Sequence, residues 1–272
     1  MQGRLDFDGL KPRLLDIHEH LDAHFGYRRP VYLRLDPVSQ LVMSLLGGRT
    51  RSEQSKAGFI ALLQRFGDWQ SVRDARLHDV LECLPHVTFA ENKAPRLQAS
   101  LGIITGHDGR PTLDHLSGLT TPQAQTWLET LPGVGPKVAS AVLNFSTLQR
   151  RSLVVDTHHQ RVARRLGLIR TTMSLGAARD VLMASLPDSW SAAKIERHHG
   201  LVKGLGQTLC TFRDRYCESC PLQKLCPTGR RGGRCVHPGT MLGTVSHAKL
   251  RPHEWKVLSK LDTKVRQPTC PL

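Results

Sequence analysis

Residues 128–139, LETLPGVGPKVA, constrain the fold of this chain more than any other segment. Apolar residues lie at helical spacing on both sides of a short turn, so we expect one helix to end near Leu131 and another to begin at Pro136, because proline suits a first helical turn. Gly133 and Gly135 permit dihedrals closed to other residues and let a ligand approach the backbone. The segment therefore predicts a helical hairpin with a ligand-facing turn, and an ordinary αα-hairpin is the alternative.

The balance of charge points to a polyanionic partner for this hairpin. The chain has 38 Lys and Arg against 23 Asp and Glu, a net charge of +15 and a pI near 10.0. Cations near phosphates release condensed counterions, so such an excess is typical of nucleic-acid binding, although a basic soluble enzyme is also compatible with it. Amides of the turn and of the following helix suit a phosphate oxygen and read no base. We therefore expect Gly133, Val134 and Gly135 to contact nucleic acid.

Helical periodicity dominates the rest of the sequence and predicts an all-α fold. Thr121-Pro122 and Asp188 are expected helix starts, and only the short SLVV run before Asp156 suggests extended chain. No N-terminal signal peptide and no run of about 18 apolar residues is visible, so we expect no membrane association and a cytoplasmic, nucleoid-associated location. The expected helical segments are 12–25, 53–66, 76–84, 91–105, 121–131, 136–147, 157–166 and 174–185.

Lys137 and Asp156 are candidate catalytic residues. Lys137 lies in the first turn of the second hairpin helix, where the positive end of the helix dipole should lower the pKa of its amine and favour nucleophilic attack on a sugar C1′. Asp156 precedes another helix, and a carboxylate there can stabilise an oxocarbenium-like sugar. The alternatives are a lysine that only contacts phosphate and an aspartate that only caps its helix.

Four of the seven cysteines form a compact ligand set. Cys210, Cys217, Cys220 and Cys226 have the spacing C-x6-C-x2-C-x5-C within seventeen residues. From their chemistry alone, a tetrahedral zinc ion and a [4Fe–4S] cluster both fit. The remaining cysteines, Cys83, Cys235 and Cys270, are expected to be ordinary thiols.

LPGVGPKVASAVL followed by VDTHHQRVARRLGL resembles the helix-hairpin-helix and Gly/Pro-Asp signature of the endonuclease III family. The resemblance implies that Lys137 attacks C1′ and that Asp156 stabilises charge and assists deprotonation. His159 stands where the family usually has an aliphatic residue. Members with this lysine are DNA base-excision glycosylases that also cut the strand by β-elimination.

The same resemblance implies the cofactor and the domains. It favours a [4Fe–4S] cluster on the four cysteines, in a loop that presents Arg213, Arg215 and Lys224 to the DNA backbone. It implies a six-helix barrel domain with the hairpin at residues 30–150. It also implies a cluster domain made of residues 1–29 together with 151–226, and a DNA cleft between these two domains. The protein is expected to be a monomer. Residues 227–272 hold nine Lys/Arg and two Asp/Glu, a net charge of +7, and are expected to be a basic extension that either contacts nucleic acid or is simply solvated.

Substrate choice depends on two further positions. In the resemblance, Arg49 stands where endonuclease III has a gap-filling glutamine, and Phe89 where it has a leucine. We expect both to enter the space left by a flipped nucleotide, a surface arginine and a core phenylalanine being the alternatives. The expected substrate is duplex DNA with an oxidised pyrimidine. A mismatched, alkylated or methylated base, and a catalytically weak iron–sulfur DNA-binding protein, remain open.

Overall fold

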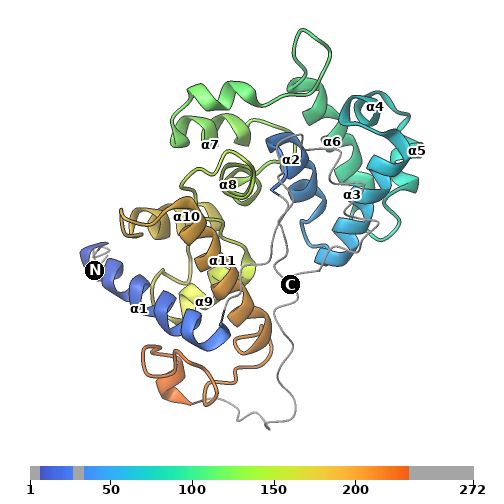
Figure 1. Cartoon of the computed structure of the whole chain (residues 1–272). Helices are drawn as coiled ribbons and strands as arrows, with labels where there is room; N and C mark the ends of the chain where they lie inside the picture. Colours follow the sequence, from blue (N-terminus) through green and yellow to red (C-terminus); the bar gives the residue numbers. More distant parts are fainter. Residues whose placement is uncertain (1–6, 27–33, 233–272) are drawn as a thin grey trace, which may run out of the picture. The chain divides into compact units, whose positions relative to one another are not determined.

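A computed structural model describes residues 7–26 and 34–232 (Figure 1), so most of the expected basic extension, with Cys235 and Cys270, lies outside the described residues. The described residues contain helices and two isolated β-bridges, Thr105 with Pro111 and Cys210 with Arg215, but no strand. The all-α fold class predicted from the sequence is confirmed. None of the helices in this part of the chain is long and apolar enough to cross a membrane.

The described residues divide into two compact units. Residues 34–149 form one, called here the hairpin unit, and residues 7–26 with 150–232 form the other, called the cysteine unit. The helices of the hairpin unit are α2 (Pro37–Leu46), α3 (Ser52–Phe66), α4 (Trp69–Asp74), α5 (Leu77–Glu82), α6 (Ala90–Ile103), α7 (Thr121–Glu129) and α8 (Pro136–Phe145), with a 3₁₀ turn at Asp114–Gly118.

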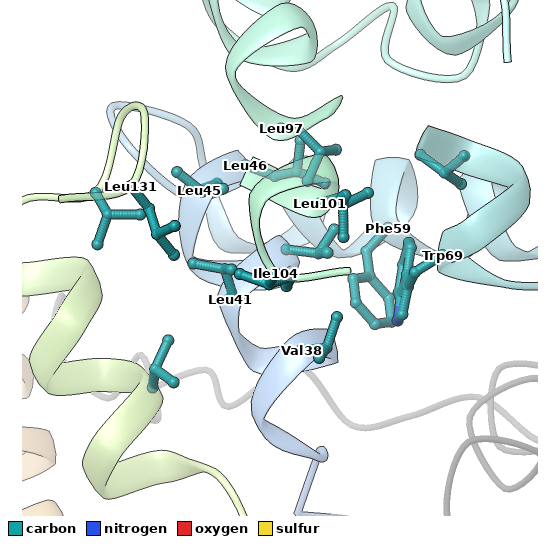
Figure 2. Packing of buried hydrophobic residues seen from close by; sticks show 14 of the residues in the cluster. Val38, Leu41, Leu45, Leu46, Phe59, Trp69, Leu97, Leu101, Ile104 and Leu131 are labelled. Carbon is teal, nitrogen blue, oxygen red and sulfur yellow. The ribbon is translucent and has the colours of Figure 1, made fainter. Parts of the chain in front are cut away.

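The core of the hairpin unit forms around α2, which packs against α8, α3 and α6. Figure 2 shows Leu41, Leu45 and Leu46 of this helix among buried side chains from other helices of the unit. Seven of its ten residues are buried, Ser39 and Ser44 among them. Trp69 completes one side of the core, where its Nε1 donates to Ser39 Oγ at 2.9 Å. Burying the indole N–H with a partner avoids the penalty of an unpaired donor.

The cysteine unit joins an N-terminal helix to the last third of the described chain. Its helices are α1 (Phe7–Phe25), α9 (Thr157–Arg165), α10 (Leu175–Ala184) and α11 (Ala192–Thr208), with a 3₁₀ turn at Gly229–Arg231. Helix α11 packs against both α9 and α1, and Arg197 of α11 forms an ion pair with Asp22 of α1. A Cβ added to Gly206 would lie 3.0 Å from Cβ of His158, so this glycine lets α9 and α11 approach closely.

Most expected helix boundaries agree with the structure, with three differences. Helix α7 starts at Thr121 as expected, and its N-cap is Thr120, whose hydroxyl and Gln123 form a capping box. Asp188 does not start a helix, because Ser191 caps α11 instead. The Oδ2 atom of Asp188 lies 3.6 Å from Nζ of Lys11 and forms an ion pair with it. The SLVV run at 152–155 belongs to no helix and, among the described residues, pairs with no strand, whereas α2 and α4 had not been expected at all.

Candidate active site

The hairpin turn between α7 and α8 is held by buried polar contacts. Gln125 of α7 donates to the carbonyl of Pro136 at 3.2 Å and accepts from Ser140 Oγ of α8 at the same distance. Ser100 of α6 donates to the carbonyl of Pro132 at 3.0 Å, which fixes the turn to the rest of the unit. These bonds order the turn backbone before any ligand binds.

The two glycines of the turn have different roles. Gly133 has a φ of +81°, and an added Cβ would lie 3.1 Å from Cδ of Arg96, so the turn needs glycine here. Gly135 does not use the conformational freedom of glycine, because its φ of −109° and ψ of −177° are open to other residues. Within the described part of the chain, and leaving out its sequence neighbours, no atom lies within 4 Å of a Cβ built on Gly135, so a ligand can approach its backbone. Val134 packs its side chain into the core and offers only its backbone.

Lys137 is half-buried in the first turn of α8, as the sequence predicted. A second lysine, Lys93 of α6, is close enough for the two charges to interact. Burial, followed by the charge of Lys137, lowers the pKa of Lys93 to about 8. The hairpin unit therefore holds two neighbouring amines where the sequence suggested one.

Arg49 and Phe89 lie together on the surface of the hairpin unit. The guanidinium carbon of Arg49 is 5.9 Å from the centre of the Phe89 ring, within the range of a cation–π contact. Phe89 is 48% exposed, so the core alternative for this residue is wrong. Both residues have left-handed backbones, with φ values of 54° and 59°. Such values are uncommon outside glycine and cluster at functional sites.

Asp156 belongs to the cysteine unit, where it caps α9. Its Oδ1 accepts a hydrogen bond from the backbone N–H of His159 at 2.8 Å, and only 9% of the residue is exposed. Burial alone would raise the pKa of this carboxyl, but the His199 ring, the His159 amide and Lys203 together hold the pKa below its usual range. The expected capping role is therefore real, and the carboxylate stays ionised at neutral pH.

Four histidines are buried in the cysteine unit, which also contains Asp156. The His159 ring stacks on His199 at 5.7 Å and meets His198 edge-on at 5.8 Å, and the His18 ring lies 5.5 Å from His198. Nδ1 of His199 is 2.7 Å from the carbonyl oxygen of Val154, so this nitrogen carries the proton and donates it. Burial is the largest cause lowering the pKa of all four rings. The sequence identified His159 only as a departure from the family pattern and did not predict this cluster.

The four candidate cysteine ligands line a single pocket, with an empty volume of about 310 Å³ that includes space open to solvent. Burial raises the pKa of Cys220 to about 11, so its thiol stays protonated at neutral pH unless a metal displaces the proton. Of the two arginines expected beside the pocket, Arg215 lines it and Arg213 is exposed on the loop between Cys210 and Cys217, as Lys224 is on the loop before Cys226. The pocket therefore fits a thiolate-bound metal centre.

The sulfurs are not gathered as closely as a zinc ion requires. Among the described residues, the one set of three His, Cys, Asp or Glu donors within 4.8 Å of one another is His78, Asp79 and Glu82 on α5. No three of the four cysteine sulfurs are therefore that close, whereas Zn–S bonds of about 2.3 Å would place sulfurs roughly 3.8 Å apart. A cuboidal cluster, in which each sulfur binds a different iron, suits the wider spacing.

Arg165 connects α9 to the pocket and was not identified from the sequence. Its Nη1 donates to Cys210 Sγ at 3.1 Å and to the carbonyl of Thr211 at 2.7 Å. Its own carbonyl accepts from Cys226 Sγ at 3.2 Å and from the Thr228 hydroxyl at 2.9 Å. One residue of α9 thus contacts both ends of the cysteine segment.

Comparisons with known proteins identify relatives of this chain. Endonuclease III of Synechocystis sp. is 29% identical over 196 residues, which cover 71% of this chain and 82% of the relative. Endonuclease III of Thermotoga maritima is 27% identical over 201 residues, with 73% and 86% covered. Both relatives support the resemblance to endonuclease III.

Solved structures share the fold. A trapped endonuclease III–DNA covalent intermediate matches with a TM-score of 0.65 and 21% identity, covering 81% of this chain and 97% of that one. A thermostable thymine-DNA glycosylase matches with a TM-score of 0.66 and 16% identity, covering 81% and 98%. The model of the HhH-GPD superfamily matches residues 42–187, just over half of the 272 residues. The chain is therefore a member of the HhH-GPD superfamily of base excision DNA repair proteins, and the predicted kinship with endonuclease III is confirmed.

Proposed function

We propose that this protein is a bifunctional DNA glycosylase and abasic-site lyase that acts, as a monomer, on a damaged base in duplex DNA. The observation that carries the proposal is the position of Lys137 in the first turn of α8, directly after a preformed turn with an open backbone at Gly135. The relatives named endonuclease III and the neighbour trapped as a covalent DNA intermediate support the same activity.

The hairpin turn would bind the DNA backbone. Amides at the N-terminus of a helix suit a phosphate oxygen, and Gly135 leaves room for it. Because Val134 buries its side chain, the turn presents backbone rather than base-reading groups, so its contact is independent of sequence. The exposed Arg213 and Arg215 would add backbone contacts from the cysteine unit.

Lys137 would supply the nucleophile. Its neutral amine attacks C1′ of the extruded nucleotide, the glycosidic bond breaks, and the base leaves with the bonding electrons and takes up a proton. The nitrogen loses its own proton, and ring opening gives a Schiff base. Removal of a C2′ proton then expels the 3′-phosphate by β-elimination. Asp156 would act on the same sugar, where its ionised carboxylate stabilises the developing positive charge.

The four cysteines Cys210, Cys217, Cys220 and Cys226 would hold a [4Fe–4S] cluster, as the shared pocket and the sulfur spacing support. When bound, the cluster supplies metal–thiolate bonds that order the loop. Arg165 would offset the negative charge of the thiolates through its hydrogen bond to Cys210. Arg213 and Arg215 are exposed on the loop between Cys210 and Cys217 and would be available to the DNA backbone.

Oxidised pyrimidines are the first candidate substrates, as the kinship with endonuclease III suggests. The exposed Arg49 favours a second candidate, a mismatched or modified pyrimidine. Its guanidinium has only donors and suits an orphaned guanine, whose O6 and N7 are acceptors. A panel containing thymine glycol opposite adenine and thymine opposite guanine separates the two.

The test of the function is borohydride trapping with Lys137→Gln. The native protein should form a covalent complex with duplex DNA containing an abasic site, and the variant should form none while binding the duplex with similar affinity. Trapping by the variant would show that Lys137 is not the nucleophile. A native protein that processed no lesion and no abasic site would indicate a catalytically inactive DNA-binding protein.

A further inference from the structure

Lys93 has a set of contacts that the proposed chemistry does not explain. It lies in the first turn of α6, and its Nζ donates three hydrogen bonds: to the carbonyls of Leu46 and Gly48, at 2.8 and 2.5 Å, and to Thr50 Oγ1 at 2.8 Å. An ammonium has three donors, so this group is fully satisfied by the end of α2 and the loop that follows it. Leu46 is the last residue of α2, where carbonyls lack helical partners and a cation is favourable.

A second contact joins this loop, residues 47–51, to the segment before α6. Thr50 Oγ1, which accepts from Lys93, also accepts from the backbone N–H of Thr88 at 3.2 Å. Arg49 precedes Thr50 and Phe89 follows Thr88, so the network lies directly beside both exposed side chains. These two are also the residues with left-handed backbones that contact each other at 5.9 Å.

Holding two such backbones requires compensation. A non-glycine residue in the left-handed region has a strained backbone, so a loop without other contacts would relax. The bonds from Lys93 and Thr50 supply that compensation on both sides. An apolar residue at position 93 would fill the space but leave the carbonyls of Leu46 and Gly48 without this donor.

We infer that Lys93 is a positioning residue that assembles Arg49 and Phe89 into one preformed wedge for the gap left by an extruded nucleotide. The inference rests on the proposed function, because it concerns the same DNA site. It differs from a catalytic role for the second lysine: all three donors of Lys93 are used within the protein, and its action on DNA passes through Arg49 and Phe89.

The binding test compares Lys93→Met with Lys56→Met, a matched loss of one charge on α3 of the same unit. Fluorescence anisotropy measures the full-length protein on a duplex with a tetrahydrofuran abasic analogue and on the undamaged duplex. Lys93→Met should reduce the preference for the analogue at least about fivefold, which corresponds to a coupling in the normal range for contacting residues. Lys56→Met should keep the native preference, and both variants should bind undamaged DNA alike.

A double-mutant cycle tests the route of the effect. In the Arg49→Ala/Phe89→Ala background the wedge is already absent, so adding Lys93→Met should change the preference by less than about twofold. The inference would be overturned if adding Lys93→Met to that background reduced the preference for the analogue as much as it does in the native protein. It would also be overturned if the single variant Lys93→Met kept the native preference. Lys93→Met should still form the borohydride-trapped complex, because Lys137 is intact.

A measurement without DNA separates this inference from the proposed function. Hydrogen exchange of the Thr88 amide should be faster in Lys93→Met than in Lys56→Met, because the acceptor Thr50 loses its anchor. Thr50→Val, which removes the hydroxyl and keeps the shape, should have the same effect if Lys93→Met folds poorly. Unchanged exchange would refute the positioning role, whereas a native protein that neither trapped nor preferred the abasic analogue would refute the proposed function alone.

Discussion

Nη1 of Arg165 lies 3.1 Å from Sγ of Cys210, and the carbonyl oxygen of the same arginine lies 3.2 Å from Sγ of Cys226. The first and last cysteines of the motif therefore both contact one residue of α9. A guanidinium that donates to a thiolate disperses its negative charge, and hydrogen bonds to cysteine sulfur raise the reduction potential of an iron–sulfur centre.

Replacing Arg165 should therefore affect the proposed metal centre directly. Arg165→Met is expected to lower the iron and sulfide content per chain and to shift the potential of the remaining cluster to more negative values. Visible absorption, iron analysis and voltammetry measure these effects. Arg164→Met is the matched control, because Arg164 donates to the carbonyl of Met173 at 2.6 Å and has no hydrogen bond to any of the described cysteines. Equal cluster loss in both variants would mean that general destabilisation is the cause.

The two glycines of the hairpin should respond differently to substitution. Gly133→Ala puts a side chain at a φ of +81° and 3.1 Å from Arg96, and should lower the free energy of unfolding by about 1–2 kcal/mol. Gly135→Ser adopts an ordinary backbone and supplies a better N-cap, so folding should be unchanged or slightly stabilised. Its side chain would occupy open space at the proposed phosphate site and should weaken DNA binding. Denaturant unfolding and anisotropy on one duplex distinguish the two effects.

Asp156→Asn separates the charge of this residue from its capping role. Asparagine also caps helices well, so the bond from the His159 amide should survive and the protein should fold. Base removal should fall by about 10²–10³-fold, the cost of losing one preorganised electrostatic contact. Cleavage of a preformed abasic site should fall much less, because no glycosidic bond is broken there. Equal losses of both activities would contradict the assignment.

The buried histidines predict acid sensitivity. The pKa values of His18 and His159 are lowered to about 4, that of His198 is well below its usual value, and all are neutral in the folded protein at pH 7. Below about pH 6.5 the unfolded chain binds more protons than the folded one. The histidines therefore do not reduce the free energy of unfolding above that pH. Toward pH 4 this free energy falls by at most about 1.4 kcal/mol per pH unit for each histidine. The Asp156 contribution is lost only at lower pH, as its carboxyl becomes protonated.

Urea unfolding at pH 7.5, 6.0 and 5.0 measures this loss. His159→Leu should remove one titrating group and flatten the dependence between pH 6.5 and 5. His78→Leu is the control, because His78 is exposed on α5 and lies outside the cluster. A dependence that remained as steep in His159→Leu as in the native protein would show that His159 does not contribute.

The sequence predicted best where local chemistry determines structure. The turn at Pro132 to Gly135, the start of α8 and the cap at Asp156 depend on nearby residues, and each was found in place. Helix α2 was missed although local signals mark its start, since Asp36 caps it and Pro37 lies in its first turn. Of helix α11 only a start near Asp188 was expected, because its core-facing residues include His198, His199 and glycines, which blur the apolar pattern.

Side-chain networks that join distant segments were beyond the sequence. Lys93 contacts residues 43 to 47 positions earlier, and Arg165 contacts the cysteine loop 45 positions later. Neither position carries a local signal, because a lysine or arginine on a helix is ordinarily solvated. Phe89 illustrates the same limit: its residue type fitted either a core or a wedge, and only its exposure in the structure excluded the core.

The ion pair between Asp22 and Arg197 spans 175 positions, and the whole hairpin unit is encoded between its two partners. During synthesis, residues 34–149 emerge as one continuous segment and can fold without later sequence. Helix α1 leaves the ribosome first, but its partners, Leu166 and Arg197 among them, follow only after the hairpin unit, and closing so long a loop is slow. A chain truncated after residue 149 should therefore contain a folded hairpin unit preceded by an unpaired amphipathic helix, exposed to chaperones for most of its translation.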